Sequence, residues 1–178
     1  ELQEINIPHS VTQIEKSAFE GCEHLYKLTL PSSLLSIKER AFADCHSLCW
    51  VDISKSKITT IEERTFDNCI KLCEIQLPPS LISIRKYAFS NCIYLGRIEL
   101  PPSLQMIEEG AFQECHRISS LHFESNIESF ETNVFSGCCS LVNINFPSSL
   151  IAIKEGAFSK CHSLIKINLP AFLSSIDE

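Results

Sequence analysis

Residues 88–110 read AFSNCIYLGRIELPPSLQMIEEG, and this 23-residue unit returns along the whole chain of 178 residues. Its most regular feature is a phenylalanine followed three residues later by a cysteine. A unit this short cannot close a hydrophobic core alone, so the sequence predicts copies stacked into a solenoid. The column phenylalanines stand 23 residues apart, with one gap of 24, at Phe19, Phe42, Phe66, Phe89, Phe112, Phe135 and Phe158.

The full pattern reads A-F-x-x-C-x-x-L-x-x-I-x-L-P-x-S-L-x-x-I-x-x-x and explains most of the composition. Seven of the ten cysteines and six of the eight prolines occupy its columns. Three further phenylalanines, Phe123, Phe130 and Phe146, replace aliphatic residues at apolar positions. We therefore expect the apolar columns to form one shared interior that includes the thiols, because free cysteine packs as a small hydrophobe.

Each unit is expected to contribute one short strand. In L-x-x-I-x-L the last two apolar side chains alternate with polar ones, and the following proline has no N–H for a ladder. Successive strands run in the same direction, so they can pair only in parallel. Such segments run from Ile5/Ile7 to Ile167/Leu169, which predicts about eight strands spaced ~4.8 Å apart.

The x-x-x-A-F-x segment before each column cysteine is expected to form a single helical turn. The residue directly before that cysteine tolerates a positive φ in five of seven copies, as in Gly21, Asp44 and Asn68. Such a residue would end the turn before the chain bends back toward the sheet. The predicted fold class is an α/β-type repeat solenoid of short parallel strands joined by turns or single helical turns.

The unit L-x-x-I-x-L-P-x-S-L-x-x-I-x-x-x-A-F-x-x-C resembles the BspA-like class of leucine-rich repeats, over the entire chain. This resemblance implies a curved, right-handed solenoid whose parallel sheet lines the concave side. Members of that family resemble one another as surface adhesion and binding proteins, so it implies a host or extracellular matrix protein as partner. The shared motif residues are all scaffold, so no binding residue can be carried over.

The phase of the repeat at the two ends predicts one leucine-rich repeat domain over residues 1–178, with seven to eight 23-residue repeats. The first residues already lie in a strand segment, and the last precede the next expected A-F pair. A solenoid needs polar caps over its terminal apolar layers, and neither end carries one. We therefore expect a fragment of a longer array.

Composition argues against several classes of function. The net charge is −7, and the lysines and arginines do not gather on one face as nucleic-acid binding requires. No apolar run is long enough for membrane insertion. Single thiols once per unit lack the close pairs of metal sites, and no nucleophile, base and oxyanion donors converge. We expect no metal, no cofactor and no catalysis.

Cys49 and Cys73 lie outside the cysteine column, at equivalent places in adjacent repeats. They are candidates for a disulfide in an oxidising compartment and for free thiols in a reducing one, whereas Cys139 has no such partner. The many unpaired thiols favour the cytoplasm, and the family resemblance favours the cell surface or secretion. The sequence leaves the compartment open.

Polar residues of the strand segments define the candidate contact surface. The residues on either side of the isoleucine column should project together onto the concave face. The one tryptophan, Trp50, is among them, and an aromatic anchor in a charged surround is typical of an interface hot spot. Alternatively, Trp50 folds over its neighbours on a solvated face. The predicted binding residues are Trp50, Asp52, Glu74, Gln76, Arg97, Glu99 and His122.

Two departures from the pattern are further candidate contacts, because a loop that breaks phase stands out from the ridge. One is the extra residue within 54–57, and the other is the stretch 124–131, where the proline is lost. Simple loop drift would explain either equally well. The leading hypothesis is a non-catalytic protein-binding module, adhesin-like or a scaffold, that binds through its concave face. The alternative is a structural segment that self-associates end to end.

Overall fold

The computed structural model describes residues 2–178, and its regular elements are fifteen short β-strands. The strands form two rows, which we name the first and the second row. The first row contains β1 (Glu4–Asn6), β3 (Lys27–Thr29), β5 (Trp50–Asp52), β7 (Glu74–Gln76), β9 (Arg97–Ile98), β11 (Ser120–His122) and β13 (Asn143–Asn145). The second row contains β2 (Gln13–Ile14), β4 (Ser36–Ile37), β6 (Thr60–Ile61), β8 (Ser83–Ile84), β10 (Met106–Ile107), β12 (Ser129–Phe130), β14 (Ala152–Ile153) and β15 (Ser175–Ile176).

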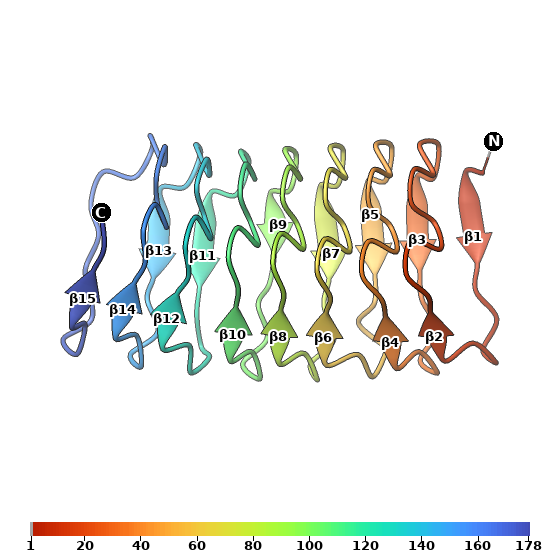
Figure 1. The fold of residues 1–178 in the computed structure, drawn as a ribbon, viewed down its shortest axis with the longest axis horizontal. Helices are drawn as coiled ribbons and strands as arrows, with labels where there is room; N and C mark the ends of the chain where they lie inside the picture. The colour runs from red at the N-terminus through yellow and green to blue at the C-terminus, as the bar shows by residue number, and fades with distance from the viewer. Residues whose placement is uncertain (1) are drawn as a thin grey trace.

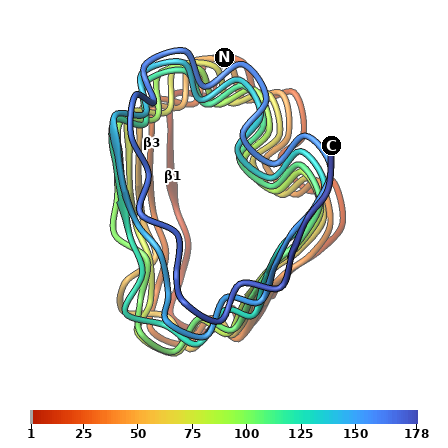
Figure 2. The same ribbon diagram turned by 90° about the vertical axis from the view of Figure 1, so that its left-hand side faces the viewer.

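The chain winds as a solenoid, with the two rows on different sides of the coils (Figure 1). Viewed along the stack, the coils superpose and enclose the core, with β1 and β3 on one long side (Figure 2). In Figure 1 the coils follow one another with little bend. The concave face expected from the resemblance is not evident in this view, and the first row presents a nearly straight outer surface.

Strand pairing is parallel throughout, as the repeat predicts, and each residue lies beside its equivalent in the next coil. The first row forms a five-stranded sheet, β1-β3-β5-β7-β9, followed by the pair β11-β13. This register places Leu28, Val51 and Ile75 in one buried column. Their polar neighbours therefore share the outer surface.

The expectation of one strand per repeat is wrong, because each complete coil carries a second, two-residue strand. The S-L-x-x-I segment alternates over too few residues for this second strand to be predicted from the sequence. Stacking nevertheless brings each extended segment beside the equivalent segment of the next coil, where the two can pair. The eighth strand expected at residues 167–169 does not form. Its coil has a neighbour on one side only, and Ile165, Ile167 and Leu169 stay exposed.

The expected helical turns are also wrong: no helix occurs in residues 2–178, and the segment around each column phenylalanine is a run of turns. Successive amides there alternate between two kinds of acceptor. The amide of Phe19 donates to the carbonyl of Ala41 in the next coil (2.8 Å), whereas that of Ala18 donates to Glu15 within its own coil (3.2 Å). Because every second amide bonds to the next coil, the i to i−4 bonds of an α-helix cannot form.

Backbone conformation explains how the chain makes these turns. The residue before each column cysteine has a positive φ in all seven copies, including Glu114 (59°) and Lys160 (59°), so that prediction is confirmed. A second positive-φ residue precedes it by four positions and was not predicted. Arginine and tyrosine at this position give no sequence signal for a left-handed conformation. The seven residues are Ser17, Arg40, Arg64, Tyr87, Gly110, Asn133 and Gly156.

The phenylalanine column forms a continuous stack through the interior. Adjacent rings from Phe19 to Phe158 lie 5.3–5.7 Å apart between centroids and are nearly parallel. The five inner rings are fully buried, and the two end rings are half-buried. The coil spacing thus fixes offset stacking as the core geometry, a favourable arrangement for aromatic pairs.

The cysteine column is buried beside this stack, as predicted, with only its first and last members half-buried. Each thiol from Cys45 to Cys161 lies 3.1–3.5 Å from the carbonyl of a phenylalanine in the preceding coil, as Cys92 does from Phe66 (3.2 Å). Burial raises the pKa of Cys45 to about 12 and that of Cys92 well above its ordinary value. These thiols therefore stay protonated at neutral pH.

The serine of the P-x-S-L segment links coils in the same way. Its hydroxyl donates to a carbonyl of the preceding coil in Ser33, Ser80, Ser103 and Ser149, at 2.6–2.8 Å. This hydrogen bond satisfies a backbone acceptor at the corner of the coil. It gives the serine column a structural role.

The two departures from the pattern coincide with interruptions of the second row. The ladder of that row breaks between β4 and β6, which lie on either side of residues 54–57, and between β10 and β12, where β12 lies within residues 124–131. In the first departure, Ser56 is buried and its hydroxyl donates to Ile53 (2.7 Å). In the second, Ile127 and Phe130 point into the core. Both departures are accommodated mainly by packing.

Candidate functional site

The outer surface of the first row brings together most of the residues predicted to bind. Direct pairing puts Trp50 between Lys27 and Glu74, with Arg97 beyond Glu74. Two residues further along the same strands, a second set of paired residues places Asp52 between Thr29 and Gln76. Adjacent strands lie ~4.8 Å apart, so these side chains share one small patch. We call this patch, made of Lys27, Trp50, Asp52, Glu74, Gln76 and Arg97, the Trp50 patch.

Trp50 is half-buried in the Trp50 patch. The ammonium of Lys27 lies over its ring, 4.5 Å from the centroid, in a cation–π contact. That contact orients the indole and keeps a positive charge beside an apolar surface, at a gain of about 0.5–1 kcal/mol for an exposed pair. The ring therefore contacts a neighbouring side chain and keeps an exposed portion.

Charged groups surround the indole on the other side. Nη1 of Arg97 lies 3.8 Å from Oε2 of Glu74, yet the Arg97 side chain is 83% exposed. An ion pair so accessible to solvent gives little stability, so Arg97 keeps its capacity to bind another group. Asp52 is held in place, because its Oδ1 accepts hydrogen bonds from the amide (2.9 Å) and hydroxyl (2.6 Å) of Ser54.

Two predicted residues lie at the margin of the Trp50 patch. Glu99 follows the end of β9 and is exposed. His122 is exposed on β11, which pairs with β13 and not with β9. The sheet ladder therefore joins Trp50, Glu74 and Arg97 directly but does not extend to His122.

Sequence reasoning missed other groups near this face. Lys27 falls on an outward position, but its contact with Trp50 follows only from the register of β3 and β5. Tyr26 and Tyr94 are exposed beside the first row, and the guanidinium of Arg117 lies 4.5 Å from the centre of the Tyr94 ring. The clearest sequence signal among them is Tyr94, an aromatic residue in an otherwise polar column.

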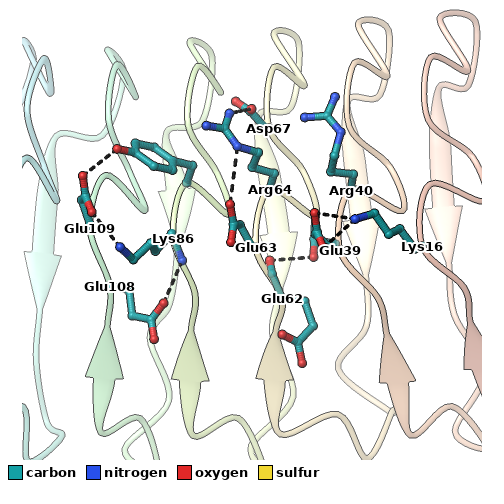
Figure 3. A network of polar contacts seen from close by, with 12 residues as sticks. Lys16, Glu39, Arg40, Glu62, Glu63, Arg64, Asp67, Lys86, Glu108 and Glu109 are labelled. Carbon is teal, nitrogen blue, oxygen red and sulfur yellow. Dashed lines mark hydrogen bonds and ion pairs between the residues drawn. The ribbon is translucent and has the colours of Figure 1, made fainter.

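A polar network covers another side of the coils, after the second-row strands (Figure 3). Lys16 contacts both carboxylate oxygens of Glu39 one coil later at 2.9 Å. Glu109 accepts from the hydroxyl of Tyr87 (2.7 Å) and from Lys86 (2.9 Å), and these bonds lower its pKa. Such exposed pairs contribute little each, so the network links coils without forming a site.

Within residues 2–178, no group of three or more histidine, cysteine, aspartate or glutamate side chains is placed to hold a metal ion. The same residues include no helix long and apolar enough to span a membrane.

Comparison with known proteins identifies the family. The family model described as "BspA type Leucine rich repeat region (6 copies)" matches residues 1–105 and 59–178. No curated protein matches the chain. Because the family model covers the whole sequence, the resemblance inferred from the repeat is confirmed.

Solved bacterial structures share the fold. A leucine-rich repeat protein from Bacteroides ovatus ATCC 8483 is 28% identical over 99% of this chain and 48% of its own, with a TM-score of 0.93. The T. pallidum leucine-rich repeat protein is 30% identical over 87% and 72%, with a TM-score of 0.81. A leucine-rich cell surface protein from Faecalibacterium prausnitzii A2-165 is 26% identical over 85% and 43%, with a TM-score of 0.79.

The chain spans about half the length of the Bacteroides ovatus protein, which covers it almost completely. The repeated A-F-x-x-C unit, the stacked coils and the family match therefore agree. This chain belongs to the BspA-type leucine-rich repeat family.

Proposed function

We propose that this chain is a non-catalytic module that binds a protein partner through the Trp50 patch. The observation that carries the proposal is the register that places Lys27, Trp50, Glu74 and Arg97 side by side on four adjacent strands. A partly exposed aromatic ring among charged groups suits a protein interface, where tryptophan and arginine supply much of the binding energy. A smooth row of strands offers such a surface without a deep pocket.

The partner class follows from the family. We propose a host or extracellular matrix protein, and a cell-surface location for this chain, because the Faecalibacterium prausnitzii relative is described as a cell surface protein. The many free thiols favour the cytoplasm instead. Locating the full-length protein by surface labelling of intact cells tests this part separately.

Binding is best tested with Trp50 itself, since it is the only tryptophan of the chain. Titration with a panel of purified extracellular matrix proteins should change its emission for a true partner. Trp50→Ala and Arg97→Ala should each weaken that binding about 30-fold or more, as at an interface hot spot. Surface plasmon resonance measures the variants, because Trp50→Ala has no indole signal.

Arg85→Ala is the matched control, since Arg85, like Arg97, pairs with a glutamate of an adjacent coil but lies next to the second row. It should bind like the parent protein. If Trp50→Ala and Arg97→Ala keep the parent affinity while folded, the Trp50 patch is not the binding surface. If Arg85→Ala alone loses binding, the partner uses the second row.

End-to-end association is a second candidate, because every coil pairs in parallel with equivalent residues of the next coil, as Trp50 does with Glu74. We propose that copies stack through such equivalent coils, with the exposed Phe172 in the contact, in a head-to-tail arrangement that would form open filaments. Sedimentation equilibrium over a range of concentrations should then show growing mass, and Phe172→Glu should abolish the growth. A monomer at every concentration contradicts stacking.

A further inference from the structure

Cys49 and Cys73 form the closest pair of thiols given by the described structure. Their Sγ atoms lie 2.7 Å apart, and the thiol of Cys73 also lies 3.2 Å from the carbonyl of Cys49. They directly precede Trp50 and Glu74, which pair in register on β5 and β7. Strand spacing thus puts their Cα atoms ~4.8 Å apart, inside the range of about 4.4–6.8 Å that a disulfide requires.

Access distinguishes this pair from the cysteine column. Column thiols such as those of Cys69 and Cys92 are buried and approach phenylalanine carbonyls. Cys73 is exposed and Cys49 is half-buried. The equivalent position in the next coil is Gly96, so no side chain there covers Cys73. An oxidant in solution therefore reaches Cys73 first.

We propose that Cys49 and Cys73 are a reversible redox site that forms a disulfide between adjacent coils. The oxidant is a small-molecule disulfide. The thiolate of Cys73 attacks one of its sulfur atoms and releases one thiolate, which leaves a mixed disulfide on Cys73. The thiolate of Cys49 then attacks Sγ of Cys73 and releases the second. The two protein thiols lose two protons and two electrons, and the reagent is reduced to two thiols.

The bond would tie together the two strands that carry Trp50 and Glu74. It would close a loop between two cysteines that stand 24 positions apart in the sequence. Closing such a loop restricts the unfolded chain more than the folded one, so the oxidised protein should be more stable. Burial and the hydrogen bond with Cys49 raise the pKa of Cys73 to about 11, so the reaction should be slow at neutral pH and faster at higher pH.

The test is incubation of the folded protein with oxidised glutathione at pH 7 and pH 8.5, followed by intact mass and peptide mapping. The expected result is a loss of two hydrogen atoms without a retained glutathione, faster at pH 8.5. Trypsin should then yield residues 41–55 linked to residues 72–85, with fragmentation separating Cys49 from Cys45 in the first peptide. The melting temperature should rise by roughly 5–10 °C and return on reduction.

Variants make the result specific. Cys49→Ser should keep a stable glutathione adduct on Cys73, because no thiol remains to resolve it, and its melting temperature should not rise. Cys139→Ser removes another half-buried thiol outside the column and should oxidise like the parent protein. A persistent adduct on Cys73 in the parent, or a bond that uses a column cysteine in the folded protein, would overturn the proposal.

Discussion

At the scale of the residue, the column cysteine combines small size with a weak donor. The thiol of Cys92 is buried and lies 3.2 Å from the carbonyl of Phe66, an acceptor that stacking would otherwise leave with fewer partners. Alanine lacks the donor, and larger apolar residues would overfill the space between coils. Repetition of this contact gives the core much of its regularity.

Buried thiols predict that stability is lost in base. The folded pKa values are raised, so this contribution is fully present below the unfolded pKa of about 9 and falls as pH rises toward the folded values. At pH 10 each such thiol costs about 1.4 kcal/mol of unfolding free energy, because the unfolded chain ionises first. Urea unfolding at pH 7, 8.5 and 10 measures the loss.

Cys92→Ala provides the internal comparison. At pH 7 it should lower the unfolding free energy by about 1 kcal/mol, through lost packing and the lost contact with Phe66. That deficit should shrink toward pH 10, because the variant has no thiol to ionise at this position. A deficit that stays constant from pH 7 to pH 10 would show that Cys92 does not titrate differently in the two states.

At the scale of the element, the irregular second-row strand β12 is held by aromatic packing. Phe130 contacts Phe123, Phe135, Phe146 and Phe158 at centroid distances of 5.1–5.9 Å. Phe130→Ala should therefore cost about 3–5 kcal/mol of unfolding free energy, measured by denaturant unfolding. Phe172→Ala, at an exposed phenylalanine, should stay within about 0.5 kcal/mol. Equal effects would contradict the proposed packing role.

The elements also show how far the sequence predicts this fold. Period, parallel pairing and the buried columns follow from apolar spacing, because stacking repeats one environment in every coil. The second-row strands were missed because two residues carry no readable alternation, and the helical turn was wrong because its amides bond to the next coil. Outward positions such as Trp50 and Glu74 could be assigned by alternation. The Lys27–Trp50 contact could be assigned only from the register of the strands. The partner could not be predicted, because the residues of the repeat motif all belong to the scaffold.

At the scale of the whole molecule, the stack is one-dimensional, since each coil contacts mainly the coils before and after it. The inner phenylalanines, such as Phe89, are fully buried, whereas Phe19 and Phe158 in the outer coils are half-buried. Nearest-neighbour coupling of this kind lets end coils open without the centre. Local stability should therefore fall from the middle of the chain toward both ends.

Hydrogen exchange tests this gradient through the amides of the phenylalanine column from Phe19 to Phe135, which donate to the next coil in equivalent bonds such as Phe19 to Ala41 and Phe89 to Ala111. Phe89 should exchange at least tenfold more slowly than Phe19. Phe158→Leu should speed exchange mainly in the C-terminal coils, because their opening does not expose the centre. Phe89→Leu removes a central ring, so it should speed exchange on both sides of that coil. Uniform acceleration by both variants would mean that the chain unfolds as one cooperative unit, against nearest-neighbour coupling.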